Sequence, residues 1–535
     1  MDQVETNIQI NDPNNNLQEN DMDLTTKYIC EHLDKSLIIF CNPISGNQEG
    51  KIIIETMNHY ISKEKYRFVD YQYIKTKNQY EPIKAVFFEL IDKDDNMKGQ
   101  KLLKHVSERC KLNKEKGLEE SFCKIKTLIA GGDGTVLSMI DSFVKNGIDI
   151  EFCIFGHIPL GTGNDLSNSL GFSNHIDISE GNMDNLYIIA LILLKYYKAK
   201  FGKVDIWKID LQLDPNEGEI LMNHKDGKAP LKDEDGNIIR RYMRSFINYV
   251  SLGYDARVGY NFDAKRSKSR NMNKCIYFLE GLKKICCRKT SSVNYFIDNF
   301  TVYDSEENSI NQESFFSNYN NDMFNNTNAK EENIIHTEIK KEPKINSIIN
   351  SFRQNNKIKF QFISKKKLQQ NKNIPSEKNK CIVLSGEPCS IIFQNIFNYM
   401  SGVKDIWGNG KDQLSIKIKN GTKEEEKKYT DKLLKMAGEN QKLDDKMLEV
   451  FTFDNGFKTG FENVFSGFAK KIYHGRGPME IKFFETPKYT KSDREHRIYF
   501  NLDGEYFHIV KPILLKIELN RDYLDGQLPF LIGNI

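Results

Sequence analysis

The chain has 535 residues, 39% of them hydrophobic, which is enough for two or three domains with packed cores. Its 77 basic and 74 acidic residues leave a net charge of +3, which argues against bulk binding of nucleic acid. No apolar run reaches the ~18 residues of a membrane span, and the ten cysteines include no C-x-x-C pair. We therefore expect a cytoplasmic protein with reduced cysteines, without transmembrane helices, zinc fingers or a disulfide framework.

The first half of the chain predicts a layered α/β domain. Residues 1–35 are polar and rich in asparagine, which predicts a disordered tail and not a signal peptide. From Ser36 onward, strand-like and helix-like segments alternate. The expected strands are 37–43, 66–74, 125–130 and 152–160, and the expected helices are 51–61, 98–112 and 136–146. This alternation predicts a largely parallel sheet flanked by helices.

Beyond about residue 200 the pattern changes to short runs rich in β-branched and aromatic residues. These runs are 203–213, 244–256, 294–303, 357–363, 381–386, 447–453, 479–484, 496–510 and 513–519. Many short strands broken by turns predict a sandwich or a barrel-like second domain. Three polar inserts, near 213–240, 304–355 and 409–440, are expected to be mobile loops on that domain.

Three loops of small residues each follow a predicted strand and precede a helix. They are 41–47 (CNPISGN), 131–135 (GGDGT) and 159–165 (PLGTGND). Amides in a glycine turn can approach a phosphate closely, and the start of a helix favours an anion. Sheets of this type bind ligands at the carboxyl ends of their strands, so we expect the loops to share one sheet edge. None of them matches a Walker P-loop or G-x-G-x-x-G.

Asp133 stands among the three glycines of the second loop. A carboxylate repels phosphate, so this side chain is better suited to holding Mg²⁺ or accepting a proton. The alternative is a tight strand–helix turn with a capping aspartate. The presence of two further loops of the same kind favours the functional interpretation.

Together with segments further along the chain, these loops resemble the catalytic domain of the diacylglycerol kinase family. The segment 248–256 (NYVSLGYDA) resembles the start of that family's accessory domain, and 502–505 (LDGE) resembles one of its last motifs. The other matching positions are 204–207 (VDIW), Arg270, Asn273, Lys274, Tyr277 and 448–450 (LEV). The resemblance runs from Ser36 to Leu519 outside the inserts, whereas GGDGT alone is shared with NAD kinases.

The resemblance implies a protein of the α/β plus β class. A Rossmann-like three-layer α/β domain of the NAD kinase and diacylglycerol kinase type would occupy 36–170, and a β-sandwich-type accessory domain with disordered inserts would occupy 171–520. It implies transfer of the ATP γ-phosphoryl group, with Mg²⁺, to the free hydroxyl of 1,2-diacylglycerol, which gives phosphatidic acid, a lipid of signal transduction. Such an enzyme would work peripherally at a membrane surface with anionic lipids.

The resemblance also implies roles for single residues. Asp133 and Glu505 are the candidates for the chemistry, and Asp133 and Asp165 for holding Mg²⁺. The positions expected to approach ATP are Asn42, Ser45, Gly46, Gly131, Gly132, Gly134, Thr135, Gly161, Thr162, Gly163, Asn164, Arg270 and Lys274.

Several of these assignments have structural alternatives. Asp503-Gly504 is also a strong hairpin signal, so Glu505 could simply follow a β-turn. Asp165 could cap the next helix, Asp255 could face the lipid headgroup or end a strand, and Arg270 could be structural. His157 is expected to be a packing residue. The basic clusters 283–284, 288–289 and 365–367 could attract anionic lipids or form solvated faces.

Competing functions are a kinase for another lipid (a sphingoid base, ceramide or monoacylglycerol), a soluble NAD kinase and a non-catalytic lipid-binding scaffold. Sphingosine kinases usually end the third loop in Asn-Ala, whereas this chain has Asn164-Asp165, which favours diacylglycerol. The segment before Ser36 lacks the His/Cys spacing of the C1 fingers that eukaryotic members usually carry, so C1-mediated regulation is not expected. Oligomeric state and acyl-chain preference leave no signal in the sequence.

Overall fold

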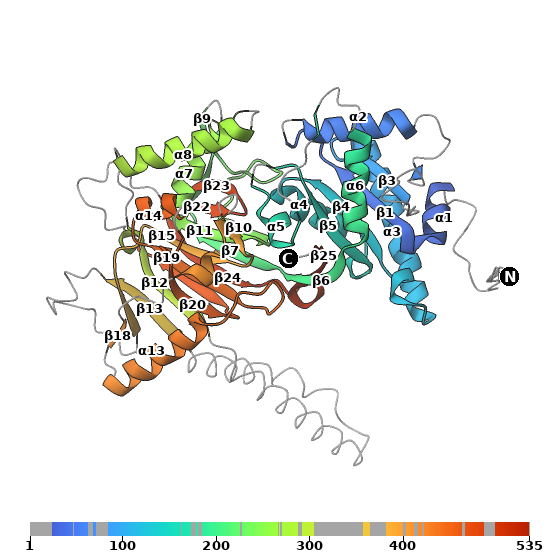
Figure 1. Cartoon of the computed structure of the whole chain (residues 1–535). Helices are drawn as coiled ribbons and strands as arrows, with labels where there is room; N and C mark the ends of the chain where they lie inside the picture. The colour runs from blue at the N-terminus through green and yellow to red at the C-terminus, as the bar shows by residue number, and fades with distance from the viewer. Residues whose placement is uncertain are drawn as a thin grey trace, which may run out of the picture.

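The structure, a computed structural model, comprises two domains joined side by side (Figure 1). It describes residues 24–46, 48–61, 68–70, 84–161, 163–172, 178–179, 185–224, 227–265, 267, 270–286, 292–303, 357–363, 381–399, 403–410, 416–419, 422–462, 466–485 and 498–533. The predicted insert at 304–355 lies outside these residues, as does most of the predicted N-terminal tail.

A seven-stranded sheet forms the middle of the first domain, with the strand order β2-β3-β1-β4-β5-β25-β6. The strands are β2 (Phe68–Asp70), β3 (Lys84–Glu89), β1 (Ser36–Cys41), β4 (Ile125–Gly131), β5 (Cys153–Pro159), β25 (Gln527–Ile532) and β6 (Lys200–Asp205). The strands from β3 to β25 run parallel to one another, and the two edge strands β2 and β6 are antiparallel. The prediction of a largely parallel sheet is confirmed.

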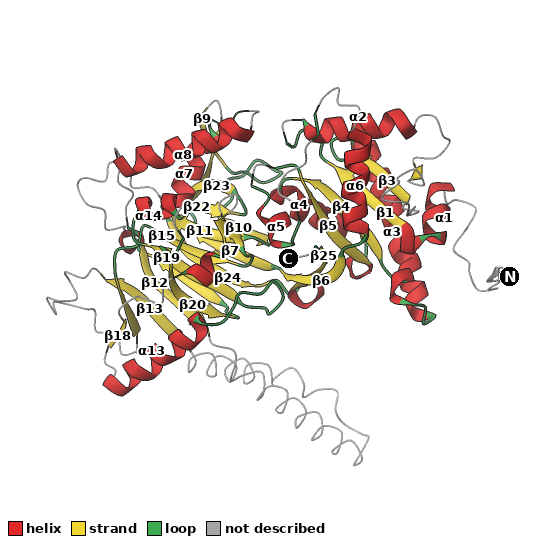
Figure 2. Ribbon diagram, in the orientation of Figure 1, coloured by secondary structure: helices red, strands yellow, loops and turns green. Residues whose placement is uncertain are grey.

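Helices cover both faces of this sheet (Figure 2). On one face α3 (Lys93–Glu115) and α4 (Asp133–Lys145) lie next to each other, and the Gln100 side chain bonds Ser142 and Asn146 between them. On the other face α2 (Glu49–Ile61) contacts α6 (Asn185–Tyr197). In the chain, α2 lies between β1 and β3, whereas α3 and α4 connect β3 to β4 and β4 to β5, in the opposite direction along the sheet. Because such crossovers are right-handed, α2 lies on one face and α3 and α4 lie on the other.

Two expectations about this domain need correction. The tail was expected to be disordered up to residue 35, but 24–31 form α1 (Leu24–Glu31), which packs on α3. Ile29 and Leu33 are buried in the domain core, and this apolar burial is what fixes the segment. Strand β3 was not predicted at all. It is a short apolar run between polar stretches, and such a run carries no helical or alternating period by which to recognise it.

The second domain is a sandwich of two eight-stranded, mainly antiparallel sheets. One sheet has the order β10-β7-β24-β21-β12-β13-β14-β18 and the other β20-β19-β15-β11-β22-β23-β8-β9. A single hydrophobic cluster, which includes Trp207 and Phe300 from the first sheet and Phe393 and Phe500 from the second, joins the two. The predicted sandwich is confirmed.

The strands of the sandwich have the following bounds. The first sheet contains β10 (Arg241–Phe246), β7 (Trp207–Leu213), β24 (Pro512–Leu519), β21 (Met479–Phe483), β12 (Ile297–Tyr303), β13 (Lys357–Ile363), β14 (Cys381–Ser385) and β18 (Ile416–Lys419). The second contains β20 (Lys470–Gly475), β19 (Leu448–Phe453), β15 (Ser390–Gln394), β11 (Tyr249–Gly253), β22 (Ile498–Leu502), β23 (Glu505–Val510), β8 (Glu219–His224) and β9 (Gly227–Pro230).

Helices lie at the two ends of the sandwich (Figure 1). Upper helices α7 (Tyr254–Asp263) and α8 (Arg270–Cys286) pack together, with the short α14 (Gly456–Phe461) beside α8. At the opposite end α13 (Lys423–Ala437) packs on β20. Among the described residues, no helix is long and apolar enough to span a membrane.

Two of the three polar inserts that were expected to be mobile loops contain regular structure where they are described. The segment near 213–240 contributes β8 and β9 to a sheet edge, and the segment near 409–440 contributes β18 and α13. The expectation of mobile loops was wrong there, because Ile220 on β8 and Ala437 at the end of α13 bury apolar surface against the sandwich.

The chain crosses between the domains more than once. After the sandwich strand β24, residues 527–532 return to the first domain and insert β25 between β5 and β6. Strands β6 and β25 thus belong to the first sheet, although both lie beyond residue 170, the predicted end of that domain. The last described residue, Gly533, donates its N–H to the Leu170 carbonyl over 2.7 Å.

Candidate active site

The three glycine-containing loops meet at the carboxyl edge of three neighbouring strands, β1, β4 and β5. The Asn42 N–H donates to the Ala130 carbonyl over 2.8 Å, and the Leu160 N–H donates to the Gly131 carbonyl over the same distance. The loops therefore start side by side. The prediction that they share one sheet edge is confirmed.

Glycines are needed where these loops touch one another. A Cβ atom on Gly161 would lie 2.9 Å from the Cα of Gly132, so any side chain there would push the second and third loops apart. Gly46 has φ +66°, and a Cβ would lie 2.4 Å from the Leu160 carbonyl oxygen. The close approach of the loops thus explains part of their glycine content, in addition to any room that a ligand requires.

Asn164 organises the third loop. Its backbone is left-handed at φ 54°, and its side-chain amide both accepts from the Gly161 N–H (2.8 Å) and donates to the Gly161 carbonyl (2.9 Å). In the first loop, the Asn42 side chain accepts a hydrogen bond from the Ile44 N–H in the same way. Thr162 lies outside the described residues. Both asparagines therefore fix loop shape, through both groups of the Asn164 carboxamide and through the carboxamide oxygen of Asn42.

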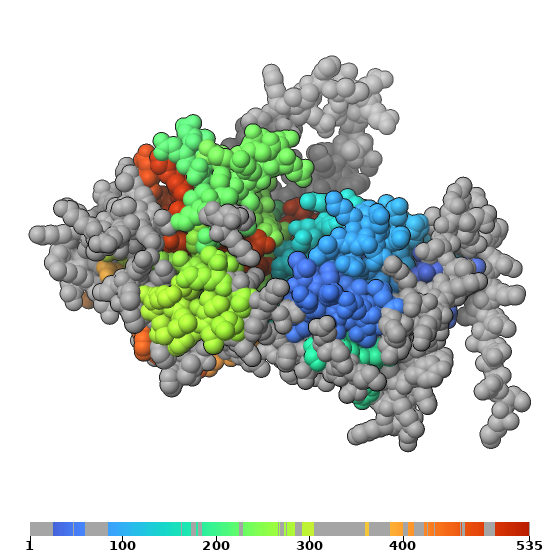
Figure 3. Space-filling model, turned by 90° about the horizontal axis from the view of Figure 1, so that it is seen from above, coloured from blue at the N-terminus to red at the C-terminus, as the bar shows by residue number. Residues whose placement is uncertain are grey.

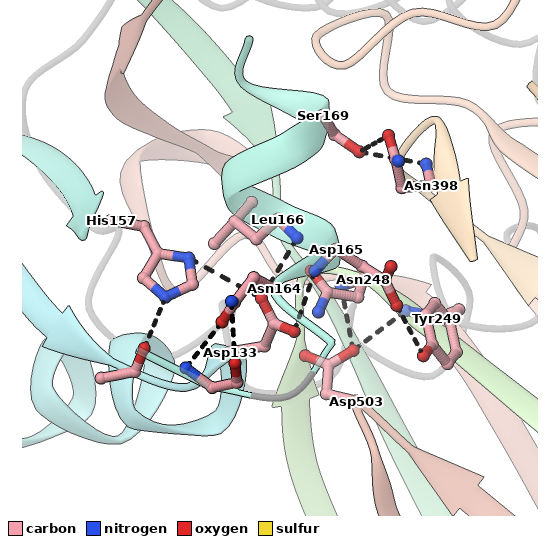
Figure 4. Close-up of polar contacts among 12 residues, drawn as sticks. Asp133, His157, Asn164, Asp165, Leu166, Ser169, Asn248, Tyr249, Asn398 and Asp503 are labelled. Atoms are coloured by element: carbon pink, nitrogen blue, oxygen red, sulfur yellow. Dashed lines mark hydrogen bonds and ion pairs between the residues drawn. The ribbon is translucent and has the colours of Figure 1, made fainter. Parts of the chain in front are cut away.

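The Asp133 carboxylate caps a helix of another segment. Asp133 is the first residue of α4. Its side chain accepts the Asp165 N–H and the Leu166 N–H, each over 3.1 Å, at the start of the short helix α5 (Asp165–Ser169) (Figure 4). These amides have no partner within their own helix, so the carboxylate satisfies them. Both the capping and the chemical interpretation of Asp133 place its charge between two helix starts, where an anion is favoured.

Burial raises the pKa of Asp133 to about 6, against the opposing effect of the amides of α5 and the side-chain amide of Asn248. Its side chain is 14% exposed. The buried His157 ring contacts the Gly131 carbonyl through Nε2 (3.1 Å), and its Nδ1 lies 3.7 Å from an Asp133 oxygen. Burial lowers the pKa of His157 to about 4, so this neighbour is neutral at physiological pH and leaves the aspartate charge uncompensated. His157, expected to be a packing residue, thus also borders the site.

Asp165 is buried and links the two domains. The hydroxyl of Tyr249, the first residue of β11, donates to an Asp165 carboxylate oxygen over 3.1 Å (Figure 4). At the other end of α5, the Ser169 hydroxyl and the Asn398 side chain and backbone N–H form a second link. The sandwich therefore holds α5, and with it the two amides that bond Asp133.

The Asp503-Gly504 pair is the hairpin turn that the sequence also allowed. Both residues have positive φ (48° and 85°), and Leu502 pairs with Glu505 across the turn. The Asp503 carboxylate accepts the N–H groups of residues 247, 248 and 249 over 2.8–2.9 Å. Burial raises its pKa to about 7, those amides oppose the rise, and the nearby charge of Asp133 adds to it. Asp503 is therefore the anchor of this turn against β11.

The turn delivers Glu505 to the glycine loop of the other domain. An ideal Cβ on Gly134 would lie 3.7 Å from the Glu505 Oε1 atom, so this carboxylate stands over the first turn of α4. Both its oxygens accept hydrogen bonds from the Arg244 guanidinium, Oε1 from Nη2 over 2.8 Å and Oε2 from Nη1. The Tyr242 hydroxyl accepts a further bond from Nη1 (3.1 Å). The Glu505 side chain is 38% exposed and thus much more accessible than Asp133.

Other predicted residues lie elsewhere or are not described in full. Arg270 and Lys274 are on α8 of the sandwich, and their side chains lie outside the described residues. Asp255 lies in the first turn of α7, just after β11, and so does not end a strand. It is buried and accepts hydrogen bonds from Ser251 and from Tyr399 (2.6 Å). The clusters 288–289 and 365–367 are not described, and Lys283 pairs with Glu280 at 2.9 Å.

The donors present suit a metal that arrives with its ligand. Among the described residues, no group of three or more His, Cys, Asp or Glu side chains could hold an ion by itself. Mg²⁺ typically binds through one or two carboxylates plus substrate phosphates and water. Asp133 accepts the backbone N–H of Asp165, so the two residues adjoin, and their carboxylates could together provide the protein ligands of such a Mg²⁺ site.

Sequence reasoning did not identify Arg244, Tyr249 and Asn248 as site residues. Asn248 and Tyr249 belong to the segment 248–256, which was recognised as a motif without any assignment of what its side chains contact. Arg244 left no signal, because its partner Glu505 lies 261 positions further along the chain.

Two family models match the chain, and together they cover well over half of it. The diacylglycerol kinase catalytic domain matches residues 36–187, and the diacylglycerol kinase accessory domain matches residues 245–506. The first span contains the three loops. The second contains Tyr249, Asp503 and Glu505, so both sides of the candidate site lie within matched regions.

Known proteins with the same family name are similar over parts of the chain. Diacylglycerol kinase 3 of Arabidopsis thaliana is 24% identical over 43% of this chain and 44% of its own length. Diacylglycerol kinase zeta of Rattus norvegicus is 27% identical over 46% of this chain and 21% of its own length. The matched stretches thus span less than half of each relative. A crystal structure of a diacylglycerol kinase from Bacillus anthracis aligns over 94% of this chain and 97% of its own, with 11% identity and a TM-score of 0.35.

Proposed function

We propose, because this chain belongs to the diacylglycerol kinase family, that it transfers the γ-phosphoryl group of ATP to the hydroxyl of 1,2-diacylglycerol and forms phosphatidic acid. The observation that carries the proposal is the meeting of Asp133 and Glu505. One carboxylate comes from each domain, and both lie at the first turn of α4, where three glycine loops converge.

The glycine loops would receive the phosphates. The start of α4 lies at the strand between the other two loops, so it would offer a triphosphate backbone amides at the positive end of a helix dipole. Phosphoryl transfer requires little covalent chemistry from the protein, and depends mostly on positioning and charge neutralisation. The rigid contacts among the loops serve the first requirement.

Mg²⁺ would provide most of the charge neutralisation, held by Asp133 and Asp165 together with the phosphates. In this arrangement the amides of α5 keep the Asp133 carboxylate in one orientation. The neutral His157 adds no competing positive charge.

Glu505 is the group that we assign as proton acceptor for the lipid hydroxyl. Its carboxylate is more exposed than that of Asp133 and projects from the sandwich toward the glycine loop, which suits a base that meets an incoming alcohol. Arg244 would position it, because the guanidinium fork holds both oxygens in one plane. A base must first be released from such a pair, and phosphate oxygens are the natural competitors for the guanidinium.

The lipid substrate requires work at a membrane surface, so we propose peripheral association with membranes, including anionic lipids, and a role in lipid signalling through phosphatidic acid. The acceptor itself is the finer point of the proposal. A sphingoid base, ceramide or monoacylglycerol carries a hydroxyl that the same phosphoryl chemistry could serve.

The test is a transfer assay with the purified chain, radiolabelled ATP and Mg²⁺. Mixed micelles would present diacylglycerol, monoacylglycerol, sphingosine or ceramide separately, and chromatography would identify the labelled lipid. We expect label in phosphatidic acid, far less of it with an Asp133→Asn variant, and loss of transfer on chelation of Mg²⁺. Label in a different lipid would replace the acceptor, and no lipid label at all would refute the function.

A further inference from the structure

Helix α8 exposes several large apolar side chains, although its Tyr277 packs against a buried hydrophobic cluster. It exposes Met272, Phe278 and Leu279 by 54%, 56% and 53%, while Asn273 and Glu280 are buried. Cys275 is exposed as well. Among the described residues no other helix or strand exposes three large apolar side chains. Large apolar side chains gathered on one exposed element indicate a contact surface, whereas scattered ones are ordinary.

The four exposed side chains lie on one face of α8. At about 100° per residue, positions 272, 275, 278 and 279 fall within an arc of about 120°. Asn273 and Glu280 lie seven positions apart, so they share a line on the inward side, toward α7 and α14. We name the outward arc of Met272, Cys275, Phe278 and Leu279 the α8 apolar face.

The helix sequence has an excess of positive charge, which suits an anionic partner. Glu280 is the one acid in the helix sequence, and two cations neutralise it, Lys265 at 2.5 Å and Lys283 at 2.9 Å. The same seventeen residues contain four basic positions, 270, 274, 283 and 284. By helix geometry positions 274 and 283 flank the α8 apolar face, whereas 270 and 284 lie further round the helix. A helix that combines an apolar face with basic positions is typical of those that lie in the interface of anionic membranes.

The α8 apolar face belongs to the end of the sandwich that forms the candidate site. Its neighbour α7 follows directly on β11, whose Tyr249 bonds Asp165, and α7 also packs on β23, whose first residue is Glu505. Helices α8 and α2 both lie on the upper side of the molecule in Figure 1, and in the view from above they form parts of one face (Figure 3). A bilayer in contact with α8 would therefore lie on the side of the molecule where the two domains meet.

We infer that the α8 apolar face is the surface by which this protein docks on a bilayer that contains anionic lipid. The inference rests on the proposed function, since the lipid substrate gives the contact its purpose. Phe278, Leu279 and Met272 would enter the boundary between headgroups and acyl chains, and the two flanking basic positions, 274 and 283, would meet the anionic headgroups. The lipid acceptor would then reach Glu505 without leaving the membrane surface.

The first experiment measures binding to vesicles independently of activity. The wild-type chain and a Phe278→Gln, Leu279→Gln double variant would be sedimented with phosphatidylcholine vesicles that contain phosphatidylserine. We expect the variant to lose at least about tenfold in apparent affinity, because burial of apolar area contributes most of the binding. As a matched control, vesicle binding of a Leu279→Gln variant is compared with that of a Leu434→Gln variant. Leu434 is 47% exposed on α13, at the opposite end of the sandwich, and its change should leave sedimentation unaltered.

A fluorescent reporter provides an independent measurement. The chain has two tryptophans, Trp207 and Trp407, and both are buried. A Phe278→Trp variant would therefore add an exposed indole whose emission should shift to the blue when vesicles are added. An unchanged spectrum at saturating vesicle concentration would overturn the inference.

Activity on two forms of substrate separates this inference from the proposed function. With diacylglycerol in vesicles, the double variant should lose activity in parallel with its binding. With a short-chain diacylglycerol presented as monomers, it should remain within about twofold of wild type. If the wild type phosphorylates neither form, the proposed function fails while the vesicle binding still tests the surface. If the double variant binds vesicles like wild type, or converts a dimer to a monomer in light scattering, the bilayer contact is wrong.

Discussion

The two acidic side chains of the candidate site are held in opposite ways. Asp133 is mostly enclosed in the α/β domain, with 14% of its side chain exposed; backbone amides of α5 fix it, and desolvation raises its pKa to about 6. Glu505 belongs to the sandwich, is more than a third exposed and is held by one side chain, Arg244. A carboxylate fixed by backbone cannot turn without moving a helix, whereas one held by an arginine can be released when the arginine finds another anion. This difference suits Asp133 to a constant electrostatic task and Glu505 to a proton transfer.

The strongest test of this division is Asp133→Asn. The amide oxygen of asparagine can still accept an N–H from α5, so the fold should persist while the charge is lost. We expect kcat to fall by about 10³-fold, the scale for removal of a preorganised charge in a site of this kind. Asp133→Ala should in addition cost about 1 kcal/mol of stability through the lost cap. Kinetics and thermal unfolding of both variants check this, and activity of the Asn variant within tenfold of wild type would remove the charge from the mechanism.

Glu505→Gln tests the other half. If Glu505 accepts the hydroxyl proton, kcat should fall by about 10²-fold, the lower end of the range for general base catalysis. The KM for ATP should change little, because the phosphate loops are untouched. The control is Asp210→Asn. Asp210 on β7 pairs with Arg241, which lies on β10 as Arg244 does, so this change also removes the carboxylate partner of an arginine on that strand. A normal kcat in Glu505→Gln would leave Glu505 as the residue after a hairpin turn and nothing more.

Gly134→Ala tests whether Gly134 is needed to leave space for a ligand or for the stability of the fold. Alanine is favoured over glycine in a helix by about 1 kcal/mol, and its Cβ would make only an ordinary contact at 3.7 Å with Glu505. We therefore expect a raised melting temperature but a loss of activity of about 10²-fold, since the methyl group occupies the space between Glu505 and the start of α4. Gly161→Ala is the contrast, because there the Cβ meets backbone at 2.9 Å and should destabilise the loops. Full activity of Gly134→Ala would mean that no phosphate lies beside Gly134.

Arg244→Lys should have a smaller effect. Lysine keeps the charge but loses the two parallel hydrogen bonds to Glu505, so we expect a decrease in kcat of about tenfold, which corresponds to about 1.4 kcal/mol. Arg244→Ala should be worse and should also raise the KM for ATP, if the guanidinium meets phosphate. Steady-state kinetics with ATP varied measure both constants. If Arg244→Lys and Arg244→Ala lowered the stability equally and left kcat and the KM for ATP unchanged, Arg244 would have a purely structural role.

The smallest expected effect is on the pH profile. Asp133 is needed ionised, and its pKa is raised, so the active form is lost as pH falls through about 6, some two units above the value for an ordinary aspartate. The profile of kcat/KM for ATP, which reports the free enzyme, should have an acidic limb near pH 6. Asp133→Asn should retain its residual activity without that limb. A limb near pH 4 in the wild type would show that burial does not control this carboxylate.

The sequence predicted those features of the fold that depend on the period of hydrophobic residues within one element or on the residue types of one loop. The parallel sheet, the sandwich and the placement of all three glycine loops at strand ends follow from short patterns, and the structure confirms them. It failed for β3, α1, β8 and α13, whose stability comes from burial against partners distant in the chain. The C-terminal return of β25 to the first sheet left no local sign for the same reason.

The residues of the site divide along the same line. Asp133 and its glycines were identifiable because a strand, a tight turn and a helix start are written within ten consecutive positions. That the Asp133 carboxylate caps α5, that Tyr249 reaches Asp165 and that Arg244 holds Glu505 were decided by tertiary structure alone. Hydrogen bonds between side chains depend on distance in space, and the packing of two domains sets that distance without leaving any period or spacing in the sequence.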